Sequence, residues 1–308
     1  MRKFLVAVFL MMAFVTPAHA QPVSIQAFWQ QEFVGKDLKL GTVLARTGAY
    51  TRHAVTYRSN GLKISGIMNV PKGKGPFPLV VLAHGYIDPD IYRSGQGLAR
   101  EQDYLARKGF IAFHTDYRNH ASSDDDPNLM RGLRLGYTMD VINAANAARN
   151  STFTFIDTDR ISLLGRSMGG GIGFNTLVSA PGVFDSAVLF ATVSSKAAEN
   201  TNKWLRNDPV IRKEIFAKYG SPESNPAFWD AASAYTYFDR VTDPVLVLHG
   251  TADETCPIRW ANEAVAKLKS LDKDVTYVKY KGVGHTFFGS TWTKSMQESV
   301  KFLKRTMA

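Results

Sequence analysis

The sequence of 308 residues contains a single cysteine, Cys256. An intrachain disulfide is therefore impossible, and the apolar core has to stabilise the folded state. With 45% hydrophobic and 21% charged residues, a chain of this length can build such a core. Internal repeats, low-complexity segments and Pro/Ser-rich linkers are also missing, which indicates one domain rather than an array.

Long apolar runs are scarce. One run, residues 4–15, lies near the N-terminus and is too short to span a bilayer comfortably. Arg2 and Lys3 precede it, and Ala18-His19-Ala20 follows. This order is typical of a secretory signal peptide, residues 1–20, cleaved after Ala20; a retained membrane anchor is the alternative. We expect residues 21–308 to be periplasmic or extracellular, without stable membrane insertion after cleavage.

No run of five basic residues occurs, although the formal net charge is +10. Loss of Arg2 and Lys3 with the signal peptide lowers the charge to +8. The remaining Lys and Arg residues are scattered singly among acids, which is typical of a solvated basic surface. This pattern argues against a nucleic-acid partner; binding to an acidic polymer is the alternative.

Strand and helix patterns alternate from about residue 50 onwards. Asn60-Gly61 lies between two alternating runs and predicts an antiparallel hairpin that opens the domain. Continuous apolar runs predict strands buried on both faces, at residues 78–85, 110–118 and 160–167. Further strands are predicted at residues 185–193, 243–253 and 274–282. Helical patterns lie between them, at residues 95–110, 130–150, 169–180, 258–271 and 291–307. This alternation predicts an α/β fold with a mostly parallel sheet and helices on both faces.

One segment, about 194–239, interrupts this alternation. It is too long for a structureless loop, and it is rich in aromatic residues. We interpret it as a helical insertion before the next strand, placed near the carboxyl edge of the sheet. Its aromatic side chains are expected to pack the insertion onto the body of the domain.

Ser167 stands in Gly165-Arg166-Ser167-Met168-Gly169, between a predicted buried strand and a predicted helix. In this context G-x-S-x-G indicates a nucleophilic serine on a sharp turn, with glycines that relieve crowding. A serine that caps the helix is the structural alternative.

A serine nucleophile needs a base and an acid that orients the base. Asp253 follows the fifth predicted strand and His285 follows the sixth, so parallel strands would bring both to the edge that carries Ser167. Glu254 is the alternative acid. The histidines at 84 and 249 are expected to be structural, and the Cys256 thiol is not expected to be the nucleophile.

Acyl transfer also needs two N–H donors for the oxyanion. Met168 follows the serine and would supply one donor. Tyr86, after the strand that ends in His84-Gly85, would supply the other. Tyr86 would otherwise be an ordinary surface aromatic residue.

Five segments together resemble the α/β-hydrolase superfamily, in particular its prolyl oligopeptidase and dienelactone hydrolase branch. They are AHGY (83–86), DYRNHASS (116–123), GRSMGG (165–170), LHGTADETCP (248–257) and GVGHTF (282–287). The resemblance implies the α/β-hydrolase fold and a Ser167–His285–Asp253 triad. Asn119 and Ala121 stand where the family often has glycine, which leaves the shape of that loop open. The resemblance does not extend to a β-propeller, and this favours an esterase over a size-gated peptidase.

The acidic stretch 122–127 could hold calcium, but its spacing favours a solvated loop. No metal or organic cofactor is implied. We therefore expect a secreted serine hydrolase that cleaves small-molecule or polymer esters. A peptidase of the prolyl oligopeptidase type is the nearest alternative, and a catalytically inactive binding protein on the same fold is the second. The acyl group, the alcohol and the oligomeric state stay open.

Overall fold

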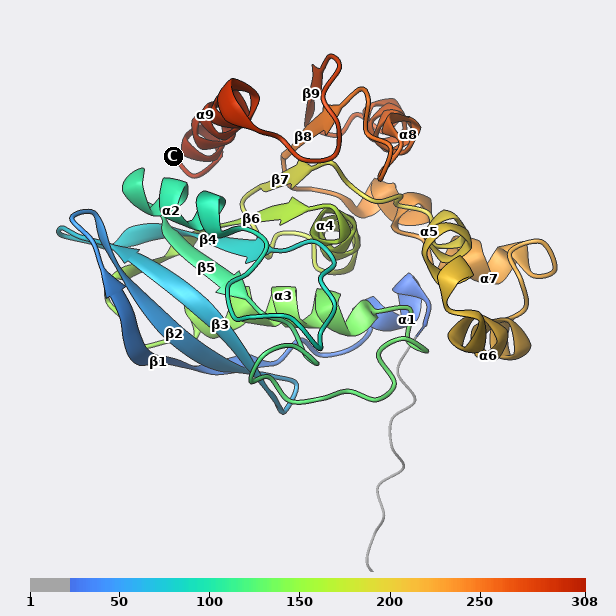
Figure 1. Cartoon of the computed structure of the whole chain (residues 1–308), viewed down its shortest axis with the longest axis horizontal. Coiled ribbons are helices and arrows are strands. Elements are labelled where there is room, and N and C mark those ends of the chain that lie inside the picture. Colours follow the sequence, from blue (N-terminus) through green and yellow to red (C-terminus); the bar gives the residue numbers. More distant parts are fainter. Residues whose placement is uncertain (1–22) are drawn as a thin grey trace, which may run out of the picture.

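The computed structural model describes residues 23–308, so the expected signal peptide, residues 1–20, lies outside the described residues. A nine-stranded sheet runs through the molecule in the order β1-β2-β3-β5-β4-β6-β7-β8-β9 (Figure 1). Strands β1, β2, β3 and β5 pair antiparallel, and the strands from β5 to β9 pair parallel. The predicted mostly parallel α/β sheet is confirmed.

The strands are β1 (Gly35–Arg46), β2 (Tyr50–Ser59), β3 (Leu62–Pro71), β4 (Phe77–Ala83), β5 (Ile111–Thr115), β6 (Ile156–Arg166), β7 (Ala187–Phe190), β8 (Val245–Gly250) and β9 (Val275–Tyr280). The helices outside the insertion are α1 (Ile25–Trp29), α2 (Ala99–Arg107), α3 (Leu135–Arg149), α4 (Met168–Ser179), α8 (Ile258–Ser270) and α9 (Gly289–Thr306). All six predicted strands and all five predicted helices are present, although no side chain of β9 is fully buried.

The N-terminal part of the sheet differs from the prediction. The hairpin of β2 and β3 turns at Asn60 and Gly61, with φ values of 45° and 93°, as the Asn-Gly pair predicts. The prediction that this pair opens the domain is wrong, because β1 precedes it and pairs with β2. Most β1 side chains after Leu38 are exposed, so this edge strand lacks the apolar alternation that would reveal it.

Alternating strand residues separate two apolar layers. Leu79 and Val81 of β4 face the layer formed with α1, α3, α4 and α8. Val80 and Leu82 face the layer formed with α2 and α9, which lie together above the sheet in Figure 1. Burial on both faces explains why β4 is apolar throughout.

The loop after β5 keeps a glycine-like backbone without glycine. Asn119 and Ala121 have φ values of 63° and 51°, a region that costs roughly 1–2 kcal/mol for most residues. Asn119 tolerates it better, and its side chain accepts from the Asp126 N–H at 2.6 Å and donates to the Asp126 carbonyl at 3.0 Å. The two departures from the family pattern therefore leave the left-handed conformation in place.

The acidic stretch 122–127 is solvated only in part: Ser122, Asp125 and Pro127 are exposed, whereas Asp124 and Asp126 bind the protein. Asp126 is 7% exposed and accepts from Arg118 Nη1 at 3.0 Å. Arg118 also binds both oxygens of the buried Asp140, at 2.8 and 3.0 Å. Asp124 accepts from the Lys63 backbone N–H at 2.7 Å. These carboxylates fasten the loop to the sheet and to α3.

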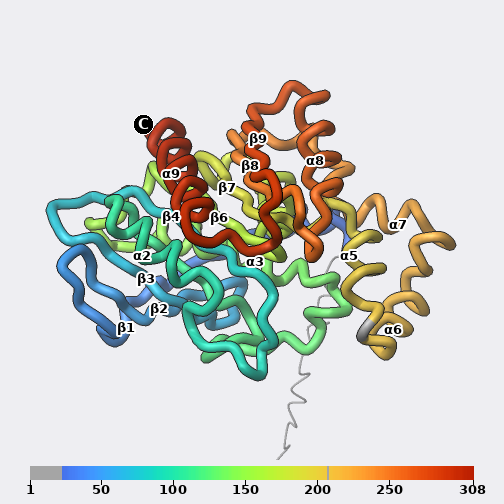
Figure 2. The backbone as a smooth tube through the Cα atoms, turned by 45° about the horizontal axis from the view of Figure 1, so that its top comes forward, coloured from blue at the N-terminus to red at the C-terminus, as the bar shows by residue number. Residues whose placement is uncertain are grey.

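The segment between β7 and β8 is helical, as predicted. It contains α5 (Ala197–Trp204), η1 (Leu205–Asn207), α6 (Pro209–Tyr219), α7 (Pro226–Ala231) and η2 (Ala234–Arg240). Helices α5 to α7 lie at the end of the molecule opposite β1 (Figure 2). They have a small apolar cluster of their own around Leu205, Ile215 and Trp229. Two ion pairs, Arg259–Glu199 and Lys196–Glu263, join the start of the insertion to α8.

Helix α4 approaches the sheet so closely that two positions admit only glycine. A Cβ at Gly169 would lie 1.9 Å from the Ala83 carbonyl oxygen, and one at Gly165 would lie 2.3 Å from the Gly169 oxygen. Real Cβ atoms do not approach backbone so closely, so any side chain there forces the turn apart. The glycines on both sides of Ser167 thus let β6 turn directly into α4.

We expect Gly169→Ala to lower the free energy of unfolding by roughly 1–3 kcal/mol, because the methyl group overlaps backbone that cannot retreat. Urea denaturation measures this change. Gly48→Ala is the control, since a Cβ there meets no atom within 4 Å and should change stability by less than about 0.5 kcal/mol. Equal stabilities of the two variants would contradict the steric account of the turn.

Candidate active site

Ser167 occupies the turn between β6 and α4 with φ 56° and ψ −117°. Its backbone is held firmly: the N–H donates to the Phe190 carbonyl at 2.9 Å, and its carbonyl accepts from the Gly170 N–H at 2.9 Å. Its hydroxyl makes no capping hydrogen bond to α4. The Ser167 side chain therefore does not cap the helix, and its backbone is strained.

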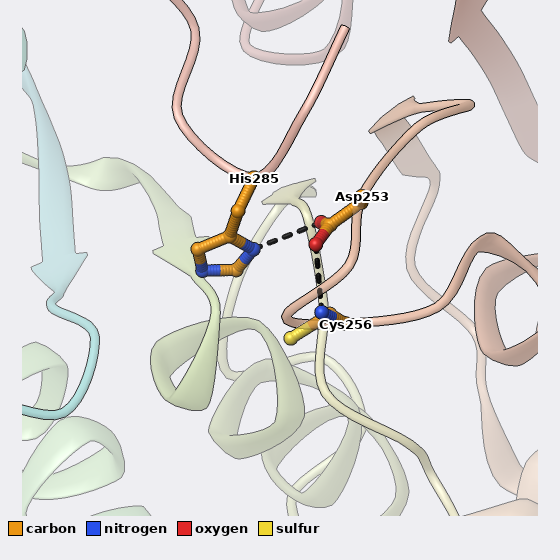
Figure 3. A group of neighbouring side chains, drawn as sticks. All are labelled: Asp253, Cys256 and His285. Atoms are coloured by element: carbon orange, nitrogen blue, oxygen red, sulfur yellow. Dashed lines mark hydrogen bonds and ion pairs between the residues drawn. The ribbon is translucent and has the colours of Figure 1, made fainter.

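Asp253 and His285 are brought together although 32 residues separate them. Asp253 follows β8 and His285 follows β9, which pair in parallel. The His285 Nδ1 donates to Asp253 Oδ2 at 2.8 Å, and the other ring nitrogen points away from the carboxylate (Figure 3). With Nδ1 carrying the proton, Nε2 is the nitrogen that can accept one.

The Asp253 carboxylate is buried and strongly hydrogen-bonded. Its Oδ1 accepts from the backbone N–H groups of Thr255 at 2.9 Å and Cys256 at 2.7 Å. The His249 Nε2 lies 3.3 Å from Oδ2. Burial alone would raise the pKa of Asp253, but the hydrogen bonds from His249, His285 and Cys256 outweigh it and hold the pKa well below its usual range. The carboxylate is therefore ionised and can stabilise a charged imidazole.

Cys256 lies beside this pair and is fully buried. Burial, followed by the charge of Asp253, raises the pKa of its thiol to about 12. The Ser167 side chain is among the nearby groups that oppose that rise. A thiol with so high a pKa is a poor nucleophile, in keeping with the expectation that Cys256 does not attack substrate.

Ser167 lies near the Asp253–His285 pair, because its neighbour Arg166 donates to Thr286 Oγ1, next to His285, at 2.8 Å. Within residues 23–308, no hydrogen bond joins the Ser167 hydroxyl to the His285 ring. Hydrogen bonds of this kind are often long without substrate and tighten when substrate binds. The three predicted residues therefore share one neighbourhood, with the Asp253–His285 bond formed.

The predicted oxyanion donors flank the serine. A Cβ at Gly85 would lie 3.2 Å from the Ser167 Cβ, so the loop after β4 passes close to the hydroxyl. Tyr86 follows with its side chain 56% exposed, and Met168 is the first residue of α4. In the described part of the chain, neither N–H has a recorded acceptor. Both donors are thus available to a ligand.

The loop after β4 is supported from behind by buried polar groups. Asp116 accepts from Tyr92 Oη at 2.7 Å, from Ser94 Oγ at 2.6 Å and from the Gly95 N–H at 2.9 Å. His84 is stacked on Tyr117, with ring centroids 4.3 Å apart, and burial lowers the pKa of His84 to about 3. A neutral, buried His84 agrees with its expected structural role.

His249 contributes more than the sequence suggested. Its Nε2 donates to the Cys256 carbonyl at 2.8 Å, as expected of a histidine that binds a loop backbone. The same nitrogen faces Asp253 at 3.3 Å, a contact that sequence reasoning missed. The four-residue spacing from His249 to Asp253 in HGTAD was the available signal, because the chain turns back on itself after β8.

Arg166 lies on the other side of the turn. Its Nη2 donates to Thr286 Oγ1 at 2.8 Å, beside His285. It lines a small recess with His285, Phe190 and Trp292. Arg166 therefore holds the segment that carries His285.

One group of potential metal ligands exists among the described residues. Ligand atoms of Asp253, Cys256 and His285 lie within 4.8 Å of one another. Asp253 Oδ2 already accepts a hydrogen bond from His285, and Asp253 Oδ1 accepts one from the Cys256 N–H. The arrangement is thus accounted for as a hydrogen-bonded pair with a neighbouring thiol.

Comparison with known proteins decides the family. The model of the prolyl oligopeptidase family matches residues 97–308, a range that includes Ser167, Asp253 and His285. The chain belongs to the prolyl oligopeptidase family. It is therefore a member of a serine hydrolase family.

Two curated relatives from Bacillus subtilis (strain 168) are similar to this family member. The uncharacterized peptidase YuxL is 26% identical over 233 residues, 73% of this chain and 34% of the relative. The chain thus spans about a third of that relative's length. The uncharacterized peptidase YtmA is 24% identical over 236 residues, 76% of this chain and 86% of the relative.

Among solved structures, acetyl xylan esterase 1 from Thermoanaerobacterium sp. JW/SL YS485 is similar with a TM-score of 0.69 and 18% identity. The likeness covers 92% of this chain and 95% of the esterase. It shows the α/β-hydrolase fold. None of the helices in residues 23–308 is both long enough and apolar enough to cross a membrane.

The low pKa of Asp253 predicts a dependence of stability on pH. In the unfolded chain an aspartate has a pKa of about 3.9, so on acidification the unfolded state binds this proton before the folded state does. The stabilisation is complete above that pKa and is lost as the pH falls towards the folded value. The side chain introduced by Asp253→Asn does not titrate. The free energy of unfolding of wild type should therefore exceed that of Asp253→Asn by less and less below about pH 4.

Urea titrations of wild type and Asp253→Asn at a series of pH values measure this advantage. Asp272→Asn, at an exposed turn, is the control and should track wild type throughout. An advantage of Asp253 that stays constant down to the acid limit would contradict the assignment of its low pKa.

Proposed function

We propose that this family member hydrolyses carboxylic esters with Ser167 as nucleophile, His285 as base and Asp253 as the acid that orients it. The observation that carries the proposal is the Asp253–His285 hydrogen bond of 2.8 Å. It lies at the same edge of the sheet as Ser167, whose hydroxyl makes no capping hydrogen bond to α4. A neutral imidazole fixed by an ionised carboxylate is the base that a serine requires.

The reaction proceeds in two steps. The Ser167 Oγ attacks the ester carbonyl carbon while its proton passes to His285 Nε2, and the N–H groups of Tyr86 and Met168 stabilise the oxyanion. The bond to the alcohol then breaks, and His285 gives the proton to the leaving oxygen. Water, deprotonated by His285, attacks the acyl-enzyme and releases the carboxylic acid together with free Ser167.

Ester cleavage is supported by the likeness to an acetyl xylan esterase over nearly its whole length. Peptide cleavage is the second candidate, because both curated relatives are described as peptidases. The same serine, base and oxyanion donors serve both reactions. The preference therefore depends on the groups that contact the two sides of the scissile bond.

Ser167→Ala is expected to lower kcat/KM for 4-nitrophenyl esters by at least about 10³-fold, because the acyl-enzyme cannot form. A series from acetate to palmitate, together with peptide anilides, compares the two substrate classes. Ser270→Ala at the exposed end of α8 is the control and should retain wild-type rates. Turnover of anilides above that of esters would replace the esterase proposal by the peptidase one.

Equal turnover by wild type and Ser167→Ala would remove Ser167 from the mechanism. Absence of any turnover, together with failure to react with a fluorophosphonate probe, would support a binding protein on the same fold.

We also propose that the protein is secreted, on the evidence of the order of charges, apolar run and small residues in 1–20. Expression of the full chain in a Gram-negative host should yield a periplasmic or extracellular product that begins at Gln21. N-terminal sequencing of that product measures the cleavage site. Replacing Ala18 and Ala20 with Arg should leave an uncleaved precursor. A variant product of the same length as the wild-type product would argue against the proposal.

A further inference from the structure

Arg134 lies at the rim of the predicted oxyanion site. Its guanidinium carbon is 5.1 Å from the centre of the Tyr86 ring, and its Nη1 is 3.8 Å from the Met168 sulfur. Tyr86 and Met168 are the two residues whose N–H groups are proposed to hold the oxyanion. A positive charge is therefore placed within one side-chain length of the position where the scissile carbonyl would bind.

The hydrogen-bonding capacity of Arg134 is largely unused. Its recorded acceptors are the sulfur atoms of Met130, 3.2 Å from Nε, and Met168, and thioether sulfur is a weak acceptor. None of the ion pairs in residues 23–308 includes Arg134. Two other arginines near it in the sequence do form ion pairs. Arg118 binds Asp126 and Asp140, and Arg131 binds Glu214 at 2.7 Å.

The backbone that presents Arg134 is strained. Leu133 and Arg134 have φ values of 50° and 60°, so two successive residues other than glycine adopt the left-handed region. Each costs roughly 1–2 kcal/mol, and such strain persists where the surrounding structure fixes it, often beside functional sites. Leu133 packs against the insertion, while Arg134 turns towards Tyr86 and Met168.

Other cations near Ser167 strengthen the positive field. Lys203 of α5 donates to the Glu254 carbonyl at 3.4 Å, so its charge stays unneutralised by that contact. Burial and the Asp253 charge raise the pKa of Cys256, and the charges of Lys203 and Arg166 are among the effects that lower it. Both cations therefore act on the neighbourhood of Ser167. The carboxylates of Glu101 and Asp253 raise the pKa of Arg166, against the larger effect of burial, whereas no ion pair in residues 23–308 neutralises Arg134.

We propose that Arg134 binds a carboxylate carried by the substrate, so that the protein selects acidic esters over neutral ones of the same size. This inference rests on the proposed function. A guanidinium held by an aromatic ring on one face and by sulfur at two N–H groups keeps further donors for a bidentate carboxylate. The oxyanion site and Arg134 then fix two points of one substrate.

Two matched pairs of substrates test the proposal. On the acyl side, the 4-nitrophenyl monoester of glutaric acid is compared with 4-nitrophenyl pentanoate. On the alcohol side, 4-acetoxybenzoate is compared with its methyl ester. Wild type should have the higher kcat/KM for the anionic member of at least one pair, and that pair identifies the side that faces Arg134. Added salt should reduce this preference.

Arg134→Gln should lower the ratio of anionic to neutral kcat/KM by about tenfold, which corresponds to about 1.4 kcal/mol. Arg134→Lys keeps the charge but loses the planar guanidinium. Its ratio of anionic to neutral kcat/KM should lie between those of wild type and Arg134→Gln. Arg131→Gln, which removes an equal charge three residues away, should leave the ratio as in wild type. An unchanged ratio in Arg134→Gln, or an equal fall in Arg131→Gln, would overturn the proposal.

Failure of the proposed function is distinguishable from failure of this inference. If neither member of a pair is hydrolysed, the esterase mechanism fails, and binding is measured instead by calorimetry on Ser167→Ala. In that background the anionic esters should bind more tightly than the neutral ones, and Arg134→Gln should abolish the difference. Equal binding of both kinds would overturn the assignment of Arg134.

Discussion

The contact between α4 and the carbonyl groups that end β4 is the constraint on which the site depends. Because Gly169 touches the Ala83 oxygen, the helix can begin directly after β6 and Ser167 is forced into its left-handed corner. The same approach places the loop of Gly85 and Tyr86 against the serine. One steric condition, the absence of a side chain at two positions, thus positions both the nucleophile and one of its proposed oxyanion donors.

The parallel sheet supplies the remaining groups. Strands β8 and β9 end at the edge where β6 ends, so Asp253 and His285 meet although they lie far from Ser167 in the chain. Hydrogen bonds then fix their charge states: backbone N–H groups and His249 keep Asp253 ionised, and Asp253 orients His285. The chemistry of the site follows from the order of the strands and from this buried hydrogen-bonding shell.

The sequence predicted the elements that carry strong local patterns. Buried strands are continuous apolar runs, and Asn60-Gly61 specifies its own turn, so both were found. Strand β1 escaped because its exposed edge has no apolar alternation. The pairing of the 122–127 carboxylates with Arg118 and Lys63, and the contact of His249 with Asp253, depend on tertiary approach. Arg134 had no sequence signal, since its place beside Tyr86 and Met168 is set by the strained turn before α3.

The insertion is connected to the rest of the molecule in a way that has mechanical consequences. Glu199 and Lys196 pair with Arg259 and Glu263 of α8, and α8 begins directly after the loop that carries Asp253. A displacement of α5 therefore pulls on the segment that sets the orientation of the acid. The side chains of these pairs are 22–57% exposed, so mobile ions partly screen them. Ionic strength thus governs the stiffness of the linkage through which the insertion and the acid loop move together.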